Sequence, residues 1–205
     1  MPLLGLPHDQ ILPEWPKTGI IGILDLEFTA WPGSLHRKWS EPFEWREIVQ
    51  IGFLLVDAAS RFRSHEGFEM LVKPVRNPHL SEYFTALTGI TQTALDSAAV
   101  PFPHALASLA EAAKPATTII FNGNDGEILR ENCLMRGLEF PLPGHRMENF
   151  RPLLKRTLGD VSGDLTSSNL PQVAGVSTKG QAHSALHDCD AIASALAVWR
   201  SNGVI

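Results

Sequence analysis

Two carboxylates at the end of a short apolar run are the first residues of the chain whose types and spacing suggest catalysis. Apart from Asp25, residues 20–26 carry almost nothing polar, which is typical of a strand covered on both faces of a sheet. Because strand side chains alternate with a period of two, Asp25 and Glu27 point to the same side, roughly 6–7 Å apart. Buried acids are costly without compensation, so the pair predicts a basic partner or a divalent cation; the alternative is a strand that ends in a solvated loop.

A third acid, Asp125, follows a second apolar run. Residues 117–121 (TTIIF) predict a buried strand, and Asp125 comes shortly after it, where a helix is expected to begin. This is the position at which α/β proteins place ligand-binding groups. The alternative interpretation is structural, because Asp is also a frequent helix N-cap.

A fourth acid, Asp188, belongs to a helix expected over residues 184–200. It shares a helix face with three apolar side chains at spacings of four, eight and eleven residues, namely Ile192, Leu196 and Trp199. A helix buries such a face, so Asp188 is predicted to point inward. Asp190 and His187 lie on other faces, where solvent is expected. His183 precedes the helix in a flexible stretch, from which it can approach the end of Asp188.

These residues together define a chemistry. The four oxygen donors come from three chain segments and are Asp25, Glu27, Asp125 and Asp188. Hard oxygen ligands select Mg²⁺ or Mn²⁺, and no set of cysteines or histidines suggests zinc. Two such ions ~3.5–4 Å apart can hold a phosphodiester and stabilise both the attacking and the leaving oxygen. A histidine such as His183, with an ordinary pKa of ~6.5, can take the proton from the attacking water.

The elements that must position these residues follow from the hydrophobic pattern. Three strands joined by short connections predict an antiparallel meander, and strand–helix alternation follows it. The strands are expected at 19–28, 47–57, 63–72, 117–121 and 147–150. Helices are expected at 80–87, 91–95, 101–113, 127–135, 152–158 and 184–200. A further short helix, which Ser167 or Ser168 could cap, is expected to run to about residue 173. The predicted fold class is α/β, with a mixed five-stranded sheet and helices on both faces.

Composition limits the remaining possibilities. The 205 residues, 44% hydrophobic and 19% charged, predict one globular domain over 19–205, preceded by a proline-rich arm over 1–18 that is either loose or laid on the domain. No apolar run approaches the ~18–20 residues that span a bilayer, and the start lacks the features of an export signal, so no membrane association is expected. The two cysteines, Cys133 and Cys189, fit reduced thiols in a cytoplasm.

The charge and the tryptophans bear on possible partners. A net charge of −5 gives no broad basic surface, so nucleic acid would bind in a local groove, as a short or single-stranded end. Residues 29–45 hold Trp31, Trp39 and Trp45 together with the basic trio at 36–38. This segment either stacks bases and holds phosphate beside the paired acids, or packs on its own domain.

The order of the acidic motifs resembles that of a known family. Asp25-Leu-Glu27, Asp125, and His183 followed five residues later by Asp188 resemble the DEDDh exonucleases of the ribonuclease H-like superfamily. The match extends over most of residues 19–200. Within that group, residues 87–92 (LTGITQ), preceded by 72–79 (VKPVRNPH), resemble the eri/histone-mRNA 3′-exonuclease branch.

The resemblance implies a 3′→5′ exonuclease that uses two Mg²⁺ or Mn²⁺ ions and releases nucleoside 5′-monophosphates from single-stranded RNA or DNA 3′ ends. It implies that Asp25 contacts both ions, that Glu27 and Asp188 bind the catalytic one, and that Asp125 binds the second. His183 would be the general base. The implied substrate contacts are Phe28, Thr29 and Ala30 beside the terminal nucleotide, Leu87 and Thr88 beside its base, and Asn122 in support of the second-motif turn.

Some features depart from the family pattern, and other functions stay open. His187 stands where the branch often has an acid, and Asn124 stands where an aromatic residue commonly precedes Asp125. The segment 31–45 is longer than in a minimal member. RNA is the expected substrate, with DNA as the alternative, because a contact to the 2′-hydroxyl cannot be read from the sequence. A nucleic-acid-binding module without catalysis, or a metal-stabilised structural domain, are the alternatives from other classes.

Overall fold

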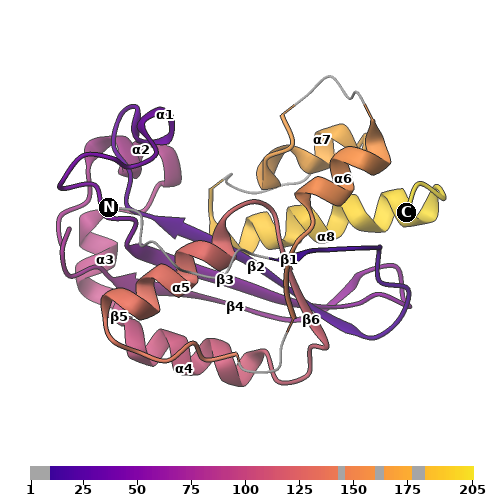
Figure 1. Cartoon of the computed structure of the whole chain (residues 1–205), viewed down its shortest axis with the longest axis horizontal. Helices are drawn as coiled ribbons and strands as arrows, with labels where there is room; N and C mark the ends of the chain where they lie inside the picture. The colour runs from indigo at the N-terminus through magenta and orange to yellow at the C-terminus, as the bar shows by residue number, and fades with distance from the viewer. Residues whose placement is uncertain (1–9, 143–145, 160–163, 177–182) are drawn as a thin grey trace.

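The chain folds around one twisted mixed sheet (Figure 1). The computed structural model describes residues 10–142, 146–159, 164–176 and 183–205. The sheet has the strand order β1-β7-β6-β2-β3-β4-β5. Its long strands form the expected antiparallel meander and are β2 (Ile20–Phe28), β3 (Ile48–Asp57) and β4 (Arg63–Lys73). Two shorter strands run parallel to β2 on its other side and are β6 (Thr118–Phe121) and β7 (Arg146–Asn149).

The expected count of five strands was wrong, because two short strands extend the sheet at its edges. β1 (Gln10–Ile11) pairs in parallel with β7, and β5 (Val100–Pro101) pairs in parallel with β4. Each has only two residues, which is too short for any alternation of polar and apolar side chains to appear in the sequence. The five strands expected from the pattern form the rest of the sheet, so the mixed α/β class itself is confirmed.

Helices cover both faces of the sheet (Figure 1). On one face lie α4 (Phe102–Ala112) and α5 (Asp125–Met135). On the other face lie α6 (Arg151–Leu158), the 3₁₀ turn η1 (Ser167–Asn169), α7 (Leu170–Val173) and the long α8 (Ala185–Ser201). α2 (Glu82–Thr88) and α3 (Gln92–Ala98) pack where β2 ends and β3 begins. Beside them lies the four-residue α1 (Ser34–Arg37), which no sequence pattern predicted.

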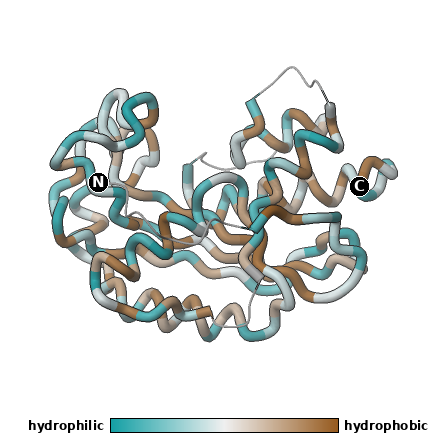
Figure 2. The backbone as a smooth tube through the Cα atoms, in the orientation of Figure 1, coloured by the Kyte–Doolittle hydropathy of each residue, from teal (hydrophilic) through white to brown (hydrophobic). Residues whose placement is uncertain are grey.

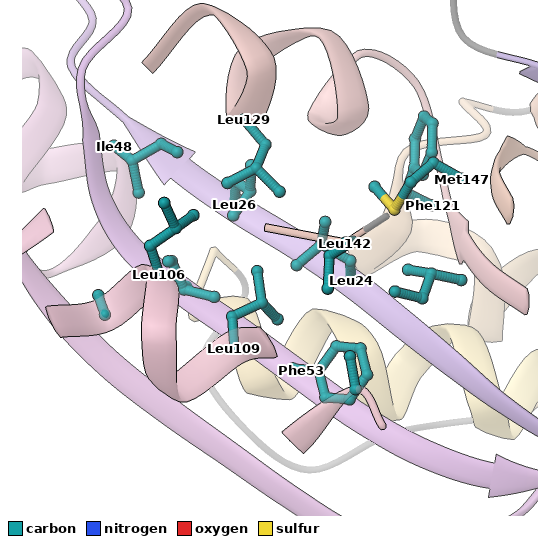
Figure 3. Close-up of a cluster of buried hydrophobic side chains, with 14 of the residues drawn as sticks. Leu24, Leu26, Ile48, Phe53, Leu106, Leu109, Phe121, Leu129, Leu142 and Met147 are labelled. Atoms are coloured by element: carbon teal, nitrogen blue, oxygen red, sulfur yellow. The ribbon is translucent and has the colours of Figure 1, made fainter. Parts of the chain in front are cut away.

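The period of two along β2 separates two hydrophobic cores. Leu24 and Leu26 face α4 and α5, in the core drawn in Figure 3. Ile21 and Ile23 face the opposite way, into the core that α8 covers. Figure 2 shows hydrophobic residues concentrated along these central strands. Because odd-numbered residues of β2 face α8, the acids that follow Ile23 at the same parity must face α8 as well.

Two expectations about helix starts change with the structure. Neither Ser167 nor Ser168 caps α7, because Ser167 and Ser168 lie inside η1 and the N-cap of α7 is Asn169. Asp125 is the first residue of α5 rather than its N-cap, which is Asn124. The carboxylate of Asp125 is therefore available for contacts outside its own helix.

The described part of the N-terminal arm lies on the domain. Leu12 and Trp15 are buried in the core under α8, and the Trp15 indole lies 6.0 Å from the Phe150 ring, centroid to centroid. The Trp15 Nε1–H donates to Thr157 Oγ1 at 3.0 Å. Residues 1–9 lie outside the described residues.

Candidate active site

Asp25 and Glu27 lie on the same face of β2, near its C-terminal end. Both side chains are buried, with 7% and 9% of their surface exposed. They continue the row of Ile21 and Ile23 and so face α8. A β-bulge between Glu27 and Phe28 ends the regular pairing with β3 at this point. Such bulges redirect a strand next to functional sites.

The neighbouring strand brings Asp125 to the same place. β6 is parallel to β2 and pairs with it only from Ile21 to Ile23, so β2 extends beyond β6. The backbone N–H of Leu26, past that pairing, donates instead to Asp125 Oδ1 at 3.1 Å. The hydrogen bond links two segments separated by 99 residues and fixes one carboxylate against the strand that carries the other two.

The start of α8 is held by side chains of β3 and β4. Gln50 Oε1 accepts from the Ala185 N–H at 3.0 Å. Glu69 Oε1 accepts from the Leu186 N–H at 3.1 Å and from Ser184 Oγ at 2.8 Å. The N-cap Ser184 makes no capping bond of its own, so the sheet provides the acceptors that the first turn of a helix needs.

A glycine lets the helix approach this close. A Cβ on Gly52 would lie 2.2 Å from the Ala185 carbonyl carbon and 2.4 Å from the Leu186 nitrogen, both backbone atoms. Any side chain at this position would therefore push the first turn of α8 away from the sheet. The position of α8 in turn fixes where its inward-facing acid lies.

That acid is Asp188, and it meets Glu27 and His183. Carboxylate oxygens of Glu27 and Asp188 and a ring nitrogen of His183 all lie within 4.8 Å of one another. Asp188 has 4% of its surface exposed, and its Oδ1 atom is buried without a hydrogen-bond partner among the described residues. His183 has a backbone φ of 63°, in the left-handed region that is uncommon for a residue with a side chain. Asp190 is exposed, as its position on the helix predicted.

Burial, together with the charge of acidic neighbours, disfavours ionisation within this cluster. Burial raises the pKa of Asp25 well above its ordinary range, and the charges of Asp125, Asp188 and Glu27 add to this, while a hydrogen bond from Ser167 opposes it. Burial likewise raises the pKa of Asp188 to about 7. The pKa of Glu27 rises through burial and then through its acidic neighbours. Buried acids in such a cluster are stabilised by a positive charge.

Among the described residues, no arginine or lysine forms an ion pair with Asp25, Glu27 or Asp188. The two arginines that line the same pocket are engaged elsewhere. Arg46 pairs with Glu127 and Glu131, and Arg151 binds the backbone and side chain of Asn122. The donor set, oxygen-rich with one imidazole and an unpartnered buried carboxylate oxygen, fits a hard divalent cation.

The acids form the floor of a pocket of about 240 Å³ with two different walls. One wall is apolar and consists of Phe28, Leu35 and Trp39. The other is polar and consists of Asn122, Arg151 and residues 166–168. Figure 1 shows α1, which contains Leu35, and α6, which begins with Arg151, on opposite sides of the upper part of the molecule.

The polar wall is a hydrogen-bonded network around the turn after β6. Asn122 donates through Nδ2 to the Leu165 carbonyl at 2.8 Å and accepts at Oδ1 from Arg151 Nε at 2.9 Å. Arg151 also donates to the Asn122 carbonyl at 3.0 Å. Asn149, at the end of β7, donates to the Gly123 carbonyl at 2.8 Å. This network holds the turn that leads into Asp125.

The structure brings some of the expected site residues together and leaves others apart. Asp25, Glu27, Asp125, His183 and Asp188 all line the pocket, as do Phe28 and Asn122. Thr29 and Ala30 do not line it. Thr29 is buried and bonds the backbone of residues 45 and 47, and the Ala30 carbonyl accepts from Ser81.

Leu87 and Thr88 also do not line the pocket. The Thr88 hydroxyl is buried and donates to the Phe84 carbonyl inside α2, and Leu87 is 37% exposed. Leu35, Trp39, Arg46 and Arg151 line it instead. Trp39 belongs to the tryptophan-rich segment that the sequence offered as a possible stacking surface, whereas Leu35, Arg46 and Arg151 were not assigned to the site. The sequence did contain an indication that Asn149 and Arg151 lie near the site. They stand at and just after the carboxyl end of β7, and polar residues at the carboxyl ends of adjacent parallel strands tend to converge.

Comparison with known proteins agrees with this geometry. A family model described as Exonuclease matches residues 23–196, which include all four acids and His183. The chain belongs to this family. It is therefore an enzyme, an exonuclease that hydrolyses phosphodiester bonds.

Individual relatives of this exonuclease are distant. It is 27% identical over 176 residues to the probable 3′-5′ exonuclease KapD of Bacillus subtilis, covering 83% of this chain and 80% of that protein. The nuclease domain of 3′hExo, a DEDDh family member bound to rAMP, aligns with a TM-score of 0.73 and 22% identity, covering 91% of this chain and 94% of that one. Cell-death related nuclease 4 aligns with a TM-score of 0.71 and 19% identity, over 91% and 65%. These structures share the fold of this exonuclease.

Within the described residues, none of the helices combines the length and hydrophobicity that crossing a membrane requires.

Proposed function

We propose that this exonuclease is metal-dependent and removes nucleotides from the 3′ end of single-stranded nucleic acid, with RNA preferred, releasing nucleoside 5′-monophosphates. The observation that carries the proposal is the convergence of four carboxylates and His183 in one pocket. Binding alone does not require an inward cluster of acids that raise one another's pKa. The buried and unpartnered Oδ1 of Asp188 adds a ligand atom without another role.

The residues that would hold two Mg²⁺ or Mn²⁺ ions are Asp25, Glu27, Asp125 and Asp188. When bound, such ions neutralise the charge of the phosphodiester and lower the pKa of a water molecule. The chain's own part is to hold the oxygen donors in fixed positions. The bond from the Leu26 N–H fixes Asp125, and the anchoring of α8 on β3 and β4 fixes Asp188.

His183 is proposed as the general base. Its ring nitrogen lies within 4.8 Å of carboxylate oxygens of Glu27 and Asp188. A scissile phosphate bound at the acids through metal ions would therefore lie next to this nitrogen. Burial lowers the pKa of His183, which favours the neutral imidazole that can accept a proton. The water oxygen bonds to phosphorus, its proton passes to His183, and the bond from phosphorus to the 3′-oxygen of the penultimate nucleotide breaks. The released 3′-oxygen takes up a proton from solvent, so the shortened strand leaves with a 3′-hydroxyl and the terminal nucleotide leaves as its 5′-monophosphate.

The direction of cleavage and the substrate class draw on related proteins. The relative from Bacillus subtilis is a probable 3′-5′ exonuclease. A related 3′-exonuclease recognises the histone mRNA stem-loop at its 3′ end, whereas Exonuclease X was solved with 5′ overhanging duplex DNA, at a TM-score of 0.56. The net charge of −5 supports a short single-stranded end over a long duplex. RNA preference follows from the resemblance to the eri branch.

A reducing, cytoplasmic compartment is part of the proposal. Cys133 and Cys189 are both free and buried. Burial raises the pKa of the Cys133 thiol to about 11, which keeps it protonated and unreactive.

The test compares single-stranded RNA and DNA of one sequence, each labelled at the 5′ end. Each strand is incubated with the protein in Mg²⁺, in Mn²⁺ or in EDTA, and Asp188→Ala serves as the inactive control. We expect a metal-dependent ladder that shortens from the 3′ end and is absent in the variant, with RNA cut faster than DNA. Equal rates would remove the RNA preference, and no ladder on either strand would contradict the proposed reaction.

A further inference from the structure

Two residues of the apolar wall, Leu35 and Trp39, belong to a segment that the catalytic proposal does not use. Leu35 in α1 has 71% of its surface exposed, although it lines the pocket beside the acids. Trp39, just after α1, lines it too, and so does Phe28 at the end of β2. An exposed leucine and an aromatic face next to buried carboxylates form an apolar surface of defined position, and large apolar groups exposed together usually meet a ligand.

The segment is rigidly built. Glu44 is buried at 5% exposure, and it accepts hydrogen bonds from Ser34 Oγ at 2.9 Å and from the Arg37 guanidinium. Ser34 Oγ in turn accepts from the Trp31 N–H at 2.8 Å. A buried carboxylate with this set of partners fixes both ends of α1 and removes the freedom that an exposed loop ordinarily has.

Trp39 is held in one orientation. Its indole Nε1–H donates to the Thr29 carbonyl at 3.0 Å, and its ring lies 5.5 Å from the Phe28 ring at an interplanar angle of 51°. Lys38 and Trp39 have φ values of 54° and 51°, in the left-handed region that bulky residues rarely adopt. Backbone strain of this kind persists where the surroundings impose it and collects at ligand sites. The polar edge of the indole is thus satisfied, which leaves an apolar ring for the pocket.

The arginine beside this wall is not free to bind a phosphate. Arg46, whose guanidinium carbon lies 6.0 Å from the Trp39 ring centroid, is paired with Glu127 and Glu131. One cation among two carboxylates leaves a negative local balance. The group that fits here is therefore flat, apolar on its faces and uncharged, which describes a nucleobase.

We propose that Leu35 and Trp39 form the binding site for the base of the substrate's 3′-terminal nucleotide. The inference rests on the proposed function, because the acids beside the wall would hold the phosphate of that same nucleotide. Leu87 and Thr88, the residues expected at the base from the resemblance, do not line the pocket, and Asn124 provides no aromatic ring before Asp125. The segment 31–46 thus supplies the stacking surface from a different part of the chain. Stacking does not depend on base identity, so the site discriminates a base from no base.

The experiment uses two RNA strands that differ only in the last residue, which carries a base in one and is abasic in the other. Cleavage is measured in Mg²⁺, and binding is measured by fluorescence anisotropy in Ca²⁺. For the wild type we expect the base-bearing strand to bind about 10-fold more tightly, from the ordinary strength of base stacking. Leu35→Ala and Trp39→Ala should each lose most of that preference and treat the abasic strand as the wild type does.

Two further variants keep the outcome decisive. Phe43→Ala alters an exposed aromatic residue of the same segment that does not line the pocket, so the preference should be retained. Trp39→Phe keeps an aromatic ring and should restore part of the preference, even if Trp39→Ala fails to fold. The proposal is overturned if the wild type binds both strands equally, or if Leu35→Ala weakens both to the same extent. Absence of cleavage in Mg²⁺ would contradict the reaction instead, since the binding comparison in Ca²⁺ does not depend on turnover.

Discussion

The floor of the pocket and its apolar wall lie next to each other but are held in place in different ways. The acids of the floor stand on β2, α5 and α8, whose backbone ladders and two hydrophobic cores position them. The segment 31–46, which contributes Leu35 and Trp39 to the wall, contains only the four-residue α1 and depends on hydrogen bonds to one buried carboxylate, Glu44.

This difference separates two tasks. Catalysis through divalent ions requires oxygen donors fixed to within a fraction of an ångström, which regular elements achieve best. Recognition of a base requires only an apolar surface of the right orientation, which a braced loop can provide and which can change without disturbing the floor. Substitutions in the floor should therefore act on turnover, and substitutions in the wall on substrate binding.

The largest effect is expected for Asp25→Asn. Activity should fall at least about 10⁴-fold, because a metal-assisted nucleophile accounts for a large part of a rate enhancement that commonly spans about 10⁶–10¹⁷. A carboxyl whose pKa is raised on folding destabilises the fold progressively as the pH rises above its ordinary pKa, and fully above its raised pKa, since it binds its proton more tightly when folded. The variant should thus melt at a higher temperature than the wild type in EDTA. The expected rise is about 2–4 °C for each kcal/mol by which the substitution increases the free energy of unfolding.

Calorimetry in EDTA and in Mg²⁺ measures this effect. The wild type should gain stability from Mg²⁺ and Asp25→Asn should not. Asp190→Asn, which changes an exposed acid of α8, is the matched control and should behave as the wild type. A lower melting temperature for Asp25→Asn in EDTA would mean that the charge of Asp25 does not destabilise the metal-free fold.

The next effect concerns the choice of histidine. His183→Ala should lower kcat by ~10²–10⁴-fold, the usual contribution of a general base, while Mg²⁺ still raises the melting temperature. His187→Ala should change kcat little, because His187 does not line the pocket. A wild-type kcat for His183→Ala, or a large loss of kcat for His187→Ala, would show that His183 is not the general base.

A smaller effect, on the same floor, is expected for Gly52→Ala. The added Cβ meets backbone atoms of Ala185 and Leu186, so the start of α8 must shift. A shift of this kind should lower kcat by about 10²-fold. Gly22→Ala is the control, because its Cβ would meet the Phe53 ring at 2.6 Å on the opposite face of the sheet. If both variants lose stability but only Gly52→Ala loses turnover, the position of α8 sets the site; equal losses of kcat would contradict this.

The smallest effect is expected in the wall, for Glu44→Gln. The substitution removes the charge that pairs with Arg37 and keeps an oxygen that can accept from Ser34. Because the Arg37 side chain is 38% exposed, screening limits the stability lost to about 1–2 kcal/mol. We expect KM to rise about 10-fold with kcat within about 3-fold of the wild type, as for a loss of uniform binding. A fall in kcat at constant KM would show that the wall also positions the floor.

Much of the floor could be predicted from the sequence. The period of two in β2 placed Asp25 and Glu27 on one face, and the helical period placed Asp188 beside Ile192 and Leu196, all of which the structure buries. The strands of the meander were predicted to within a residue or two. These are local properties, because periodicity records which side of a single element is covered.

The anchoring of that floor was decided only by the tertiary structure. Glu69 and Leu186 are separated by 117 residues, and Gln50 and Ala185 by 135. Nothing within either segment indicates its partner. Gly52 gave no signal either, since its role depends on the backbone of α8 that passes over it.

The pocket wall was likewise outside the reach of sequence patterns. The segment with three tryptophans was noticed, but which tryptophan faces the acids depends on hydrogen bonds of Glu44 and Thr29 rather than on spacing. Trp45 instead lies under Arg76, 3.8 Å from its guanidinium carbon, and Trp31 packs on Phe43. The sequence by itself determined the fold class and the inward acids, because each depends on one element's periodicity. Only the folded chain decided which side chains surround those acids, because that depends on contacts between elements remote in sequence.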